Sequence, residues 1–457
     1  VAAQFEILAA LILLILGWLF VPFYLKSGVF TMPEFLEMRY NPAARGYLSW
    51  VSIVAYVLTK ISVTIAAGGI VFTALLGIDF WTGAILIVLI TGAYTVLGGM
   101  KAVGYTDLIQ MFILVGGSLA LTFYGLDHVG GIDGLSAKTE ASYLSLWRPL
   151  SDPEFPWTGI LFGAPILGVW YWCTDQFIVQ RVLAAKDLEN ARKGTIFAGY
   201  LKMLPLFIFV LPGVIAFALS TGPDAIISFP MIDGKEQYDA ALPLLVMQLL
   251  PSGLKGLVVA GLLAALMSSL SSVFNSCSSL FTIDIYKKYD PSCSEKKLVV
   301  IGQVATGVLV ILGLAWIPMF NIIEGGLFQK LQSIQAYIAP PIAAVFLLGL
   351  FMKRINSAGA MTALITGAIV GVTRLVLELN KSVLDSNGFL YYVADINFLH
   401  FALIMFILCS GILIAVSLMT KSDENPNLDL VTYSPSSLGY KRINAFLTAG
   451  LLVLVGI

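Results

Sequence analysis

Charged residues are scarce in this chain of 457 residues. Asp, Glu, Lys and Arg together make up 12% of it, whereas 58% of the chain is hydrophobic. An average soluble domain has about 25% charged residues, so the composition excludes an ordinary soluble globular protein. The formal net charge of −1 gives no information about partners.

Cysteine and histidine are also rare. The two histidines, His128 and His400, lie far apart, and the four cysteines are scattered without paired spacing, at Cys173, Cys277, Cys293 and Cys409. Disulfide frameworks and zinc sites need such residues in close pairs, so the sequence predicts neither. No Ser-His-Asp or paired-carboxylate arrangement stands out, and we therefore expect no enzyme.

Long apolar runs, by contrast, recur along the whole chain. A helix needs about 20 apolar residues to cross the hydrocarbon core of a bilayer. The runs are continuously apolar rather than alternating, which predicts spanning helices and not a barrel. The sequence therefore predicts an all-α integral membrane protein with about twelve spans, at 3–25, 47–76, 80–98, 105–126, 157–181, 193–219, 254–284, 298–318, 328–351, 357–378, 396–419 and 443–457.

The expected loops differ in charge between the two sides of the membrane. If the first span runs from outside to inside, most of the 26 Lys and Arg residues fall in inner loops, whereas the outer loops carry many acidic residues. Loops rich in Lys and Arg stay on the cytoplasmic side, which fixes this orientation. We expect a multi-pass protein of the plasma membrane, which is the inner membrane in a bacterial cell.

Two of the spans, 47–76 and 254–284, are about thirty residues long, longer than a perpendicular crossing requires. They lie five spans apart and therefore cross the membrane in opposite directions, as the members of inverted repeats do. The outer loop at 127–156 suits a boundary between such repeats. We expect a single transmembrane domain made of the remainder of a first repeat, a second repeat and peripheral helices, at 1–126, 157–351 and 357–457.

The span at 157–181 carries unusual polar chemistry in its second half, GVWYWCTDQFIVQR (168–181). An amphipathic helix end would explain Arg181 at the inner surface, but it explains Asp175 and Gln176 less well, because they lie more than a turn deeper. Helix-breaking residues precede or open this stretch, at Gly159, Gly163, Pro165 and Gly168. We therefore expect a broken helix here, in which Asp175 and Gln176 make supporting polar contacts.

Several stretches are specific enough to compare with a known family. They are WYWCTDQFIVQR (170–181) with the LAAK that follows it, GYTDLIQ (104–110), GYLKMLP (199–205), MSSLSSVFNS (267–276), LFTIDIYKKY (280–289), PPIAAVFLLGLF (340–351) and KRINSAGAMTALITGAIVG (353–371). In these stretches the chain resembles the sodium/glucose cotransporters of the solute:sodium symporter family. The resemblance implies a LeuT-type core of two inverted five-helix repeats, and it implies that the broken first helix of the first repeat precedes Val1.

Three polar residues within spans match the sugar site of that family. Glu6 matches a glutamate that accepts hydrogen bonds from sugar hydroxyls, Lys202 a lysine that donates to them, and Gln332 a sugar-binding glutamine. Gln335 lies three residues further, on the same helical face, and is a weaker candidate. The alternatives are an interfacial position for Glu6, a snorkelling side chain for Lys202 and polar helix-helix contacts for the two glutamines.

Aromatic residues match the family's gates. Tyr171 and Trp172 offer flat faces to the C–H face of a pyranose, and Tyr171 matches the inner gate tyrosine. Phe328 matches an outer gate residue that Phe5 would join, although simple packing is the common role of phenylalanine in a membrane protein. Gly168 departs from the pattern, because some bacterial members carry a sugar-binding asparagine there.

A serine-rich segment matches the family's sodium site. Ala265, Ser268 and Ser269 are the expected ligands, since sodium is a hard cation that prefers oxygen. Asp107 resembles the acidic residue on the family's sodium exit path. A close-packed helix face would also be satisfied by the serine-rich composition, and a helix cap would explain Asp107.

These matches predict symport of a hexose-like sugar, glucose or galactose, into the cell by alternating access. Sodium is the expected coupling ion and no cofactor is expected. The expected partners are the sugar, sodium and membrane lipid, without nucleic acid, and the oligomeric state stays open. The alternatives are another cargo such as myo-inositol or sialic acid, or a sodium-permeable channel or sugar sensor. Glu6 argues against an anionic cargo, because two like charges would share the site.

Overall fold

The computed structural model describes residues 2–140, 143, 145–223, 225–232, 235–320, 326–434 and 441–456. In this part of the chain, nine helical stretches are long and apolar enough to cross a membrane, at Ala3–Ser27, Pro42–Leu76, Leu108–Val129, Leu188–Ser220, Ser252–Tyr289, Glu295–Pro318, Leu327–Phe351, Ser357–Leu379 and Phe398–Met419. Shorter apolar helices lie at Phe80–Ala93, Gly159–Thr174, Tyr238–Leu249 and Arg442–Val455. Each predicted span falls on one of these helices, which confirms the all-α membrane fold.

The first half of the chain forms α1 (Ala2–Ile15), η1 (Leu16–Phe20), α2 (Val21–Ser27), α3 (Met32–Arg39), α4 (Pro42–Tyr56), η2 (Val57–Ile61), α5 (Ser62–Leu76), α6 (Phe80–Val129), α7 (Gly131–Lys138), η3 (Gly159–Gly163), α9 (Ala164–Gly168), η4 (Val169–Thr174), α10 (Gln176–Leu183), α11 (Leu188–Leu201), η5 (Leu206–Val210) and α12 (Leu211–Ser220). The segments η1 to η5 are π-helical turns. Such wide turns are rare and frequently lie at functional sites.

The second half forms β1 (Met231–Ile232), β2 (Lys235–Glu236), η6 (Tyr238–Ala240), α13 (Ala241–Leu249), α14 (Ser252–Ser279), η7 (Leu280–Tyr286), α15 (Lys287–Tyr289), α16 (Glu295–Phe320), α17 (Leu327–Phe351), α18 (Ser357–Leu379), η8 (Lys381–Val383), α19 (Phe389–Asp395), α20 (Phe398–Met419), α21 (Leu428–Val431) and α22 (Arg442–Val455). The two strands pair antiparallel in one short hairpin.

The structure differs from the predicted spans in two places. The stretch that was expected to connect 80–98 with 105–126 is helical, and α6 runs through it. This stretch holds glycine but no proline, so no residue in it removes a helical hydrogen bond. The helix η6–α13 was not predicted, because its apolar run is too short to span a bilayer.

Local capping residues fix where the early helices begin and end. The side chain of Thr31 accepts a hydrogen bond at the start of α3, and that of Asn41 does so at the start of α4, next to Pro42. Gly77 ends α5 with a φ of 64°, a conformation that glycine adopts without strain. Asp79 then caps α6 by accepting from two backbone amides. These residues satisfy the backbone groups that a helix end leaves free.

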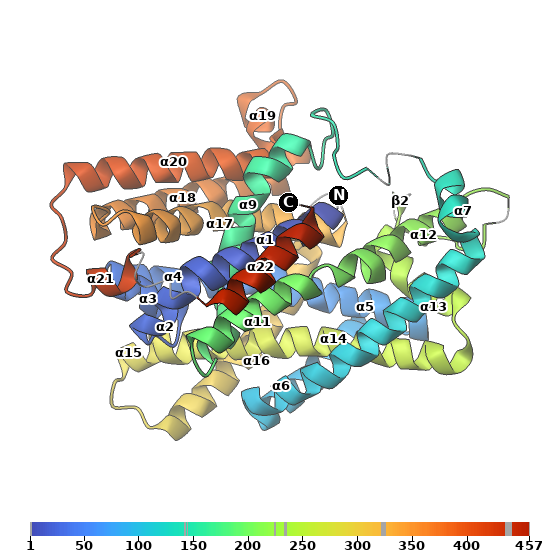
Figure 1. The fold of residues 1–457 in the computed structure, drawn as a ribbon, viewed down its shortest axis with the longest axis horizontal. Coiled ribbons are helices and arrows are strands. Elements are labelled where there is room, and N and C mark those ends of the chain that lie inside the picture. The colour runs from blue at the N-terminus through green and yellow to red at the C-terminus, as the bar shows by residue number, and fades with distance from the viewer. Residues whose placement is uncertain are drawn as a thin grey trace.

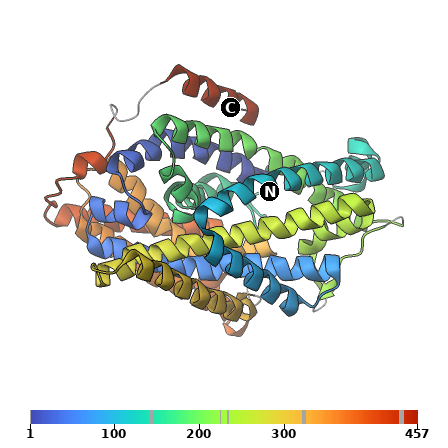
Figure 2. The ribbon, with the colours of Figure 1, turned by 90° about the horizontal axis from the view of Figure 1, so that it is seen from below.

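The helices pack as a bundle along the long axis of the molecule (Figures 1 and 2). α17 lies against α18, α20 and the η4 turn, and one apolar core joins these helices to α1 and α3. α14 lies against α6, α5 and α16, and a second core joins α14 and α16 to α4 and α5. α22 lies at the edge, beside α11 (Figure 2). The site described below lies where α1, η4 and α17 meet.

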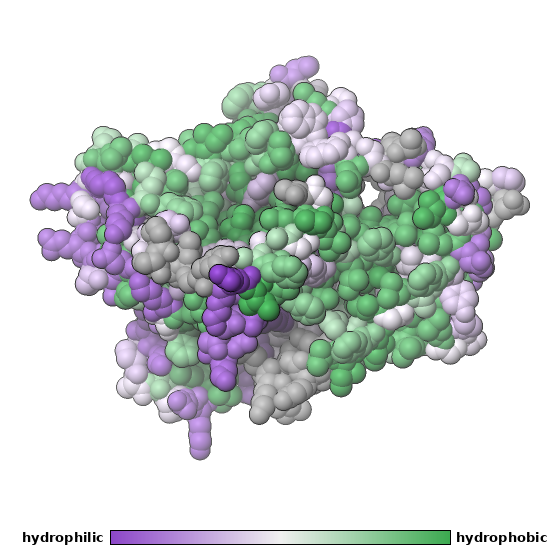
Figure 3. Space-filling model, in the orientation of Figure 1, coloured by the Kyte–Doolittle hydropathy of each residue, from purple (hydrophilic) through white to green (hydrophobic). Residues whose placement is uncertain are grey.

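The surface of the bundle matches a membrane environment. Hydrophobic residues cover the middle of the face in Figure 3, and hydrophilic residues gather toward its two ends. Large apolar side chains such as Phe112, Ile311 and Ile369 are more than 60% exposed on three different helices, which is the pattern that contact with lipid tails requires. We call the end that bears Lys26 and Lys288 the basic end, which the positive-inside rule assigns to the cytoplasm.

The broken helix is present, but the break lies at Asp175 and not in the glycine-rich stretch before it. Helical backbone continues from η3 through η4, and Asp175 alone is extended, with φ −81° and ψ 125°. The glycines serve packing: a Cβ at Gly163 would clash with the Leu399 carbonyl, and one at Gly168 with the Ile12 side chain. Asp175 ends the helix because its carboxylate caps α10, accepting from the Phe177 amide at 3.1 Å.

Candidate substrate and ion sites

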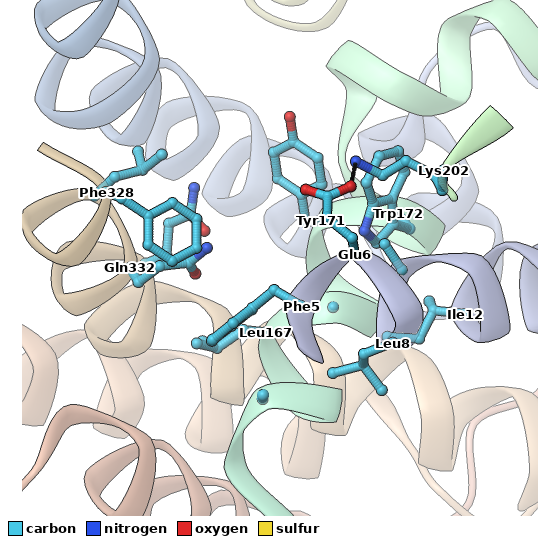
Figure 4. Close-up of a pocket in the computed structure, with 15 residues that line it drawn as sticks. Phe5, Glu6, Leu8, Ile12, Leu167, Tyr171, Trp172, Lys202, Phe328 and Gln332 are labelled. Carbon is cyan, nitrogen blue, oxygen red and sulfur yellow. Dashed lines mark ion pairs between the residues drawn. The ribbon is translucent and has the colours of Figure 1, made fainter. Parts of the chain in front are cut away.

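A pocket of about 720 Å³, including its open mouth, lies between α1, α9–η4, the end of α11 and α17 (Figure 4). All six residues predicted to bind substrate line it, namely Glu6, Tyr171, Trp172, Lys202, Gln332 and Gln335. Phe5, Phe328 and Gly168 line it too. The structure thus gathers residues from four separate segments of the sequence in one place, while their roles stay predictions.

Glu6 and Lys202 face each other inside this pocket. Lys202 Nζ lies 2.5 Å from Glu6 Oε2, and each side chain keeps about a quarter of its surface exposed, at 24% and 23%. The ammonium also lies 5.1 Å from the centroid of the Trp172 ring. Lys202 therefore does not extend along the helix to the membrane surface, as a snorkelling lysine would.

Lys202 reaches this position because α11 ends there. Leu201 is the last helical residue, Lys202 is the C-cap, and Pro205 precedes the wide turn η5. Carbonyl groups at a helix C-terminus carry partial negative charge, which favours a cation. The end of α11 thus places the ammonium beside α1 and Glu6 (Figure 4).

α17 supplies the opposite wall. Gln332 is half-buried and Gln335 is 3% exposed, and both line the pocket with Phe328. Their spacing of three residues places them on one face of α17. An amide has both donors and acceptors, so this wall can bind a ligand that is rich in hydroxyl groups.

Aromatic rings border the pocket on two sides. The Tyr171 and Trp172 rings lie 5.0 Å apart, at 78° to each other. Phe5 lies 5.4 Å from Phe328, and both rings pack edge-on or tilted against Phe155. Phe155 is 7% exposed and was not predicted from the sequence. The only signal was an apolar residue, Phe155, next to acidic residues in the outer loop SDPEFPW.

A buried ionic cluster adjoins Tyr171 but does not line the pocket, and its Lys60 Nζ lies 4.8 Å from the centroid of the Tyr171 ring. Asp175 forms an ion pair with Lys60 and accepts a hydrogen bond from the Tyr56 hydroxyl. The predicted polar contacts of Asp175 are thereby confirmed, whereas Lys60 was not predicted. The signal was available, because a single lysine in the apolar span 42–76 marks a functional site by default.

Gln176 has a different supporting role. Its Oε1 accepts from the Met32 amide at 2.8 Å, and its Nε2 donates to the Phe30 carbonyl at 3.3 Å. These two bonds tie the start of α10 to the start of α3. The predicted polar contacts of Gln176 are thereby confirmed, and they are structural rather than ligand contacts.

The candidate sodium residues lie on α14. Ala265 and Ser268 are half-buried and Ser269 is exposed, and their spacing places all three on one face of the helix. Asp107 belongs to the helical backbone of α6, but its side chain lies outside the described residues. Among the described residues, no group of three or more His, Cys, Asp or Glu could hold a metal ion. The sodium assignment stays a prediction.

Sequence comparison places the chain in a family. The sodium:solute symporter family model matches residues 1–367. Sodium/glucose cotransporter 1 of Sus scrofa is 38% identical over 96% of this chain and 71% of its own length. The sodium/mannose cotransporter of Bos taurus is 39% identical over 94% of this chain and 77% of its own length.

Solved structures show the same fold. A Na⁺-coupled sialic acid symporter in a substrate-bound outward-open state matches with a TM-score of 0.75 and 21% identity, over 93% of this chain and 84% of that one. A nucleobase-cation-symport-1 family transporter in a closed conformation matches with a TM-score of 0.54 and 14% identity, over 94% and 90%. These likenesses confirm the LeuT-type fold. The chain belongs to the sodium:solute symporter family, whose members are transporters and not enzymes.

Proposed function

We propose that the chain couples inward sodium flow to the uptake of a hexose-like sugar, glucose or galactose, by alternating access in the plasma membrane. The observation that carries the proposal is the ion pair of Glu6 with Lys202 in a pocket that Gln332 also lines. Relatives that are 38–39% identical are named for glucose and for mannose, which are both hexoses.

Each wall of the pocket suits one part of a pyranose. Glu6 accepts hydrogen bonds from hydroxyl groups, and Lys202 donates to hydroxyl or ring oxygens. The amides of Gln332 and Gln335 can both donate hydrogen bonds to hydroxyl groups and accept hydrogen bonds from them. The rings of Tyr171 and Trp172 face the apolar C–H surface of the sugar. A sugar that enters would thus replace part of the contact between Glu6 and Lys202 with bonds to itself.

Sodium would bind on α14, at Ala265, Ser268 and Ser269, through hydroxyl and carbonyl oxygens. Asp107 would lie on the path by which the ion leaves. The inward field contributes about 2.3 kcal/mol per charge per 100 mV, which adds to the sodium concentration gradient. Phe5 and Phe328 would close the pocket toward the outside, and Tyr171 would close it toward the basic end.

The proposal includes the division of the chain into the remainder of a first repeat, a second repeat and peripheral helices, at 1–126, 157–351 and 357–457. In an inverted-repeat transporter, substrate and coupling ion bind where the two repeats meet, next to interrupted helices. The pocket is consistent with that rule. Glu6 belongs to the first part, whereas Tyr171 and Gln332 belong to the second.

Uptake of labelled sugars into proteoliposomes tests the proposal. Glucose or galactose should accumulate above its outside concentration when sodium is directed inward, and an inside-negative potential should increase the rate. Equal uptake in potassium buffer would disprove coupling, and entry without accumulation would favour a channel or sensor. Preference for sialic acid or myo-inositol in the same panel would replace the proposed cargo and leave the mechanism in place.

A further inference from the structure

Lys60 is a lysine buried in the middle of the membrane-spanning bundle. It is 8% exposed and lies in the wide turn η2, between α4 and α5. Its ammonium pairs with Asp175, whose side chain is 1% exposed. A charge in such a place is strongly unfavourable without its partner. Leucine at position 60 would avoid this unfavourable free energy, so the ion pair calls for a functional explanation.

Aromatic rings enclose the same ammonium. Lys60 Nζ lies 4.3 Å from the centroid of the Phe177 ring, 4.5 Å from that of Tyr56 and 4.8 Å from that of Tyr171. A cation within about 6 Å of an aromatic face is attracted to the ring. One face of this cage is therefore Tyr171, which also lines the substrate pocket.

The cluster joins two parts of the chain across the helix break. Lys60 and Tyr56 belong to the span 42–76, whereas Asp175 is the extended residue between η4 and α10. The helix that holds Asp175 runs from the outer loop toward the basic end, so Asp175 lies inward of Tyr171. Separating the two parts at this point would open the pocket toward the basic end.

We propose that Lys60 and Asp175 form a latch beneath the pocket, which positions Tyr171 under the substrate and parts when the pocket opens inward. The proposal rests on the proposed transport function. In this role Lys60 is a positioning residue, which acts through the Tyr171 ring and makes no contact with the cargo. Other charged and titratable groups lie around the pair. Arg181 bonds separately to the Phe177 carbonyl and to Ser272, and Cys277 lies in the same apolar core as Tyr56.

Native cysteines report on the latch. Cys277 is buried beside the cluster, Cys409 is buried on α20, and Cys293 is partly exposed between α15 and α16. A membrane-impermeant maleimide applied from the basic side, followed by peptide mass spectrometry, measures the labelling of each cysteine separately. Lys60→Gln removes the ion-pair partner of Asp175 and should increase the labelling rate of Cys277 about tenfold or more. Cys409 should stay protected.

Two further variants sharpen the test. Lys60→Arg keeps the charge and should return Cys277 labelling toward the wild-type rate. Glu378→Gln is the matched control: Glu378 accepts a hydrogen bond from the Tyr337 hydroxyl and pairs with Arg374 at 3.4 Å, but it does not line the pocket. This variant should leave Cys277 labelling unchanged.

The outcomes separate the latch from simple stability. If Lys60→Gln labels like the wild type, or if Lys60→Arg gives no rescue, the latch is disproved. Labelling of Cys409 together with Cys277 would also disprove it, because the pair would then hold the whole fold. The labelling experiment requires no sugar. A wild-type protein that transports no hexose would therefore overturn the proposed function, whereas the labelling rates would still test the latch.

Discussion

Lys202 and Glu6 are 196 residues apart in the sequence, yet the ammonium of one lies 2.5 Å from the carboxylate of the other, inside the pocket. Each group limits the unfavourable effect of burying the other. A hydroxyl-rich ligand can replace this contact, because it offers donors to Glu6 and acceptors to Lys202. The two side chains that we propose to bind sugar thus also pair with each other.

The pair should behave as a coupled unit in the absence of sugar. Glu6→Gln and Lys202→Gln should each lower the melting temperature, and the double variant should lose less than the sum of the two. We expect a coupling of about 1 kcal/mol, since both groups are partly exposed and solvent screens them. Thermal unfolding of the purified protein in detergent measures it. Strictly additive shifts would show that the contact has no energetic consequence.

Sugar and sodium should respond to different substitutions. Gln332→Ala and Glu6→Ala should weaken sugar binding by about 1–3 kcal/mol each, because buried partners lose hydrogen bonds, with little effect on sodium. Ser268→Ala and Ser269→Ala should weaken sodium binding far more than sugar binding. Equilibrium binding of each ligand, measured separately, distinguishes the two sets.

Matched controls exist for both sets. Gln248 is exposed on α13 and Thr362 is exposed on α18, and neither lines the pocket. Gln248→Ala and Thr362→Ala should change neither affinity. If all four site variants shift sugar and sodium affinity alike, the assignment of the residues to two sites is wrong.

Much of the site was predictable because its chemistry lies in short local motifs. Glu6, Lys202 and Gln332 are polar residues within apolar spans, and Lys202 also lies in a stretch that resembles one family, GYLKMLP (199–205). The bilayer makes such residues conspicuous, since a polar group there needs a partner or a cavity. The spans were predictable for the same reason, because their length follows from the membrane thickness.

The missed features depend on contacts between distant segments. Phe155 looks like an ordinary loop residue until the fold places it against Phe5 and Phe328. The glycines before Asp175 predict a break, but in the fold their missing side chains allow close approach to Leu399 and Ile12. Local sequence cannot distinguish these two uses of glycine, because the decisive neighbour is more than 150 residues away.

Phe155 should contribute to the outer closure of the pocket. Its ring contacts Phe5, Phe328 and Phe398. Its backbone amide donates a hydrogen bond to Asp152 Oδ1 at 2.8 Å. An aromatic pair contributes about 0.5–1.5 kcal/mol beyond area burial, so Phe155→Ala should raise the sugar KM roughly two- to tenfold. Phe155→Leu, which keeps most of the apolar volume, should have a smaller effect. An unchanged KM in Phe155→Ala would exclude this role.

The basic end should lose stability in acid, and Glu37 on α3 should be one cause. Its carboxylate lies 2.7 Å from Arg45 and 2.5 Å from Lys288, and Arg45 also bonds to Asp284 at 2.6 Å. These contacts join α3 to α4 and to the end of the span 252–289. Burial alone would raise the pKa of Glu37, but the hydrogen bonds from Arg45 and Lys288 outweigh it and lower the pKa below its usual 4.5.

The sign of the pH effect follows from this shift. A carboxyl whose pKa is lower in the folded state contributes stability that is fully present above its unfolded pKa and is lost as the pH falls through the folded value. The melting temperature should therefore decrease as the pH is lowered below about 4.5. Glu37→Gln should be less stable than the wild type at neutral pH, and its melting temperature should decrease less steeply in acid. Glu424→Gln, in an exposed loop, serves as the control and should follow the wild-type curve. A Glu37→Gln curve parallel to the wild type across this range would show that another group causes the acid loss, and the network around Arg45 would then have to be retested at Asp284.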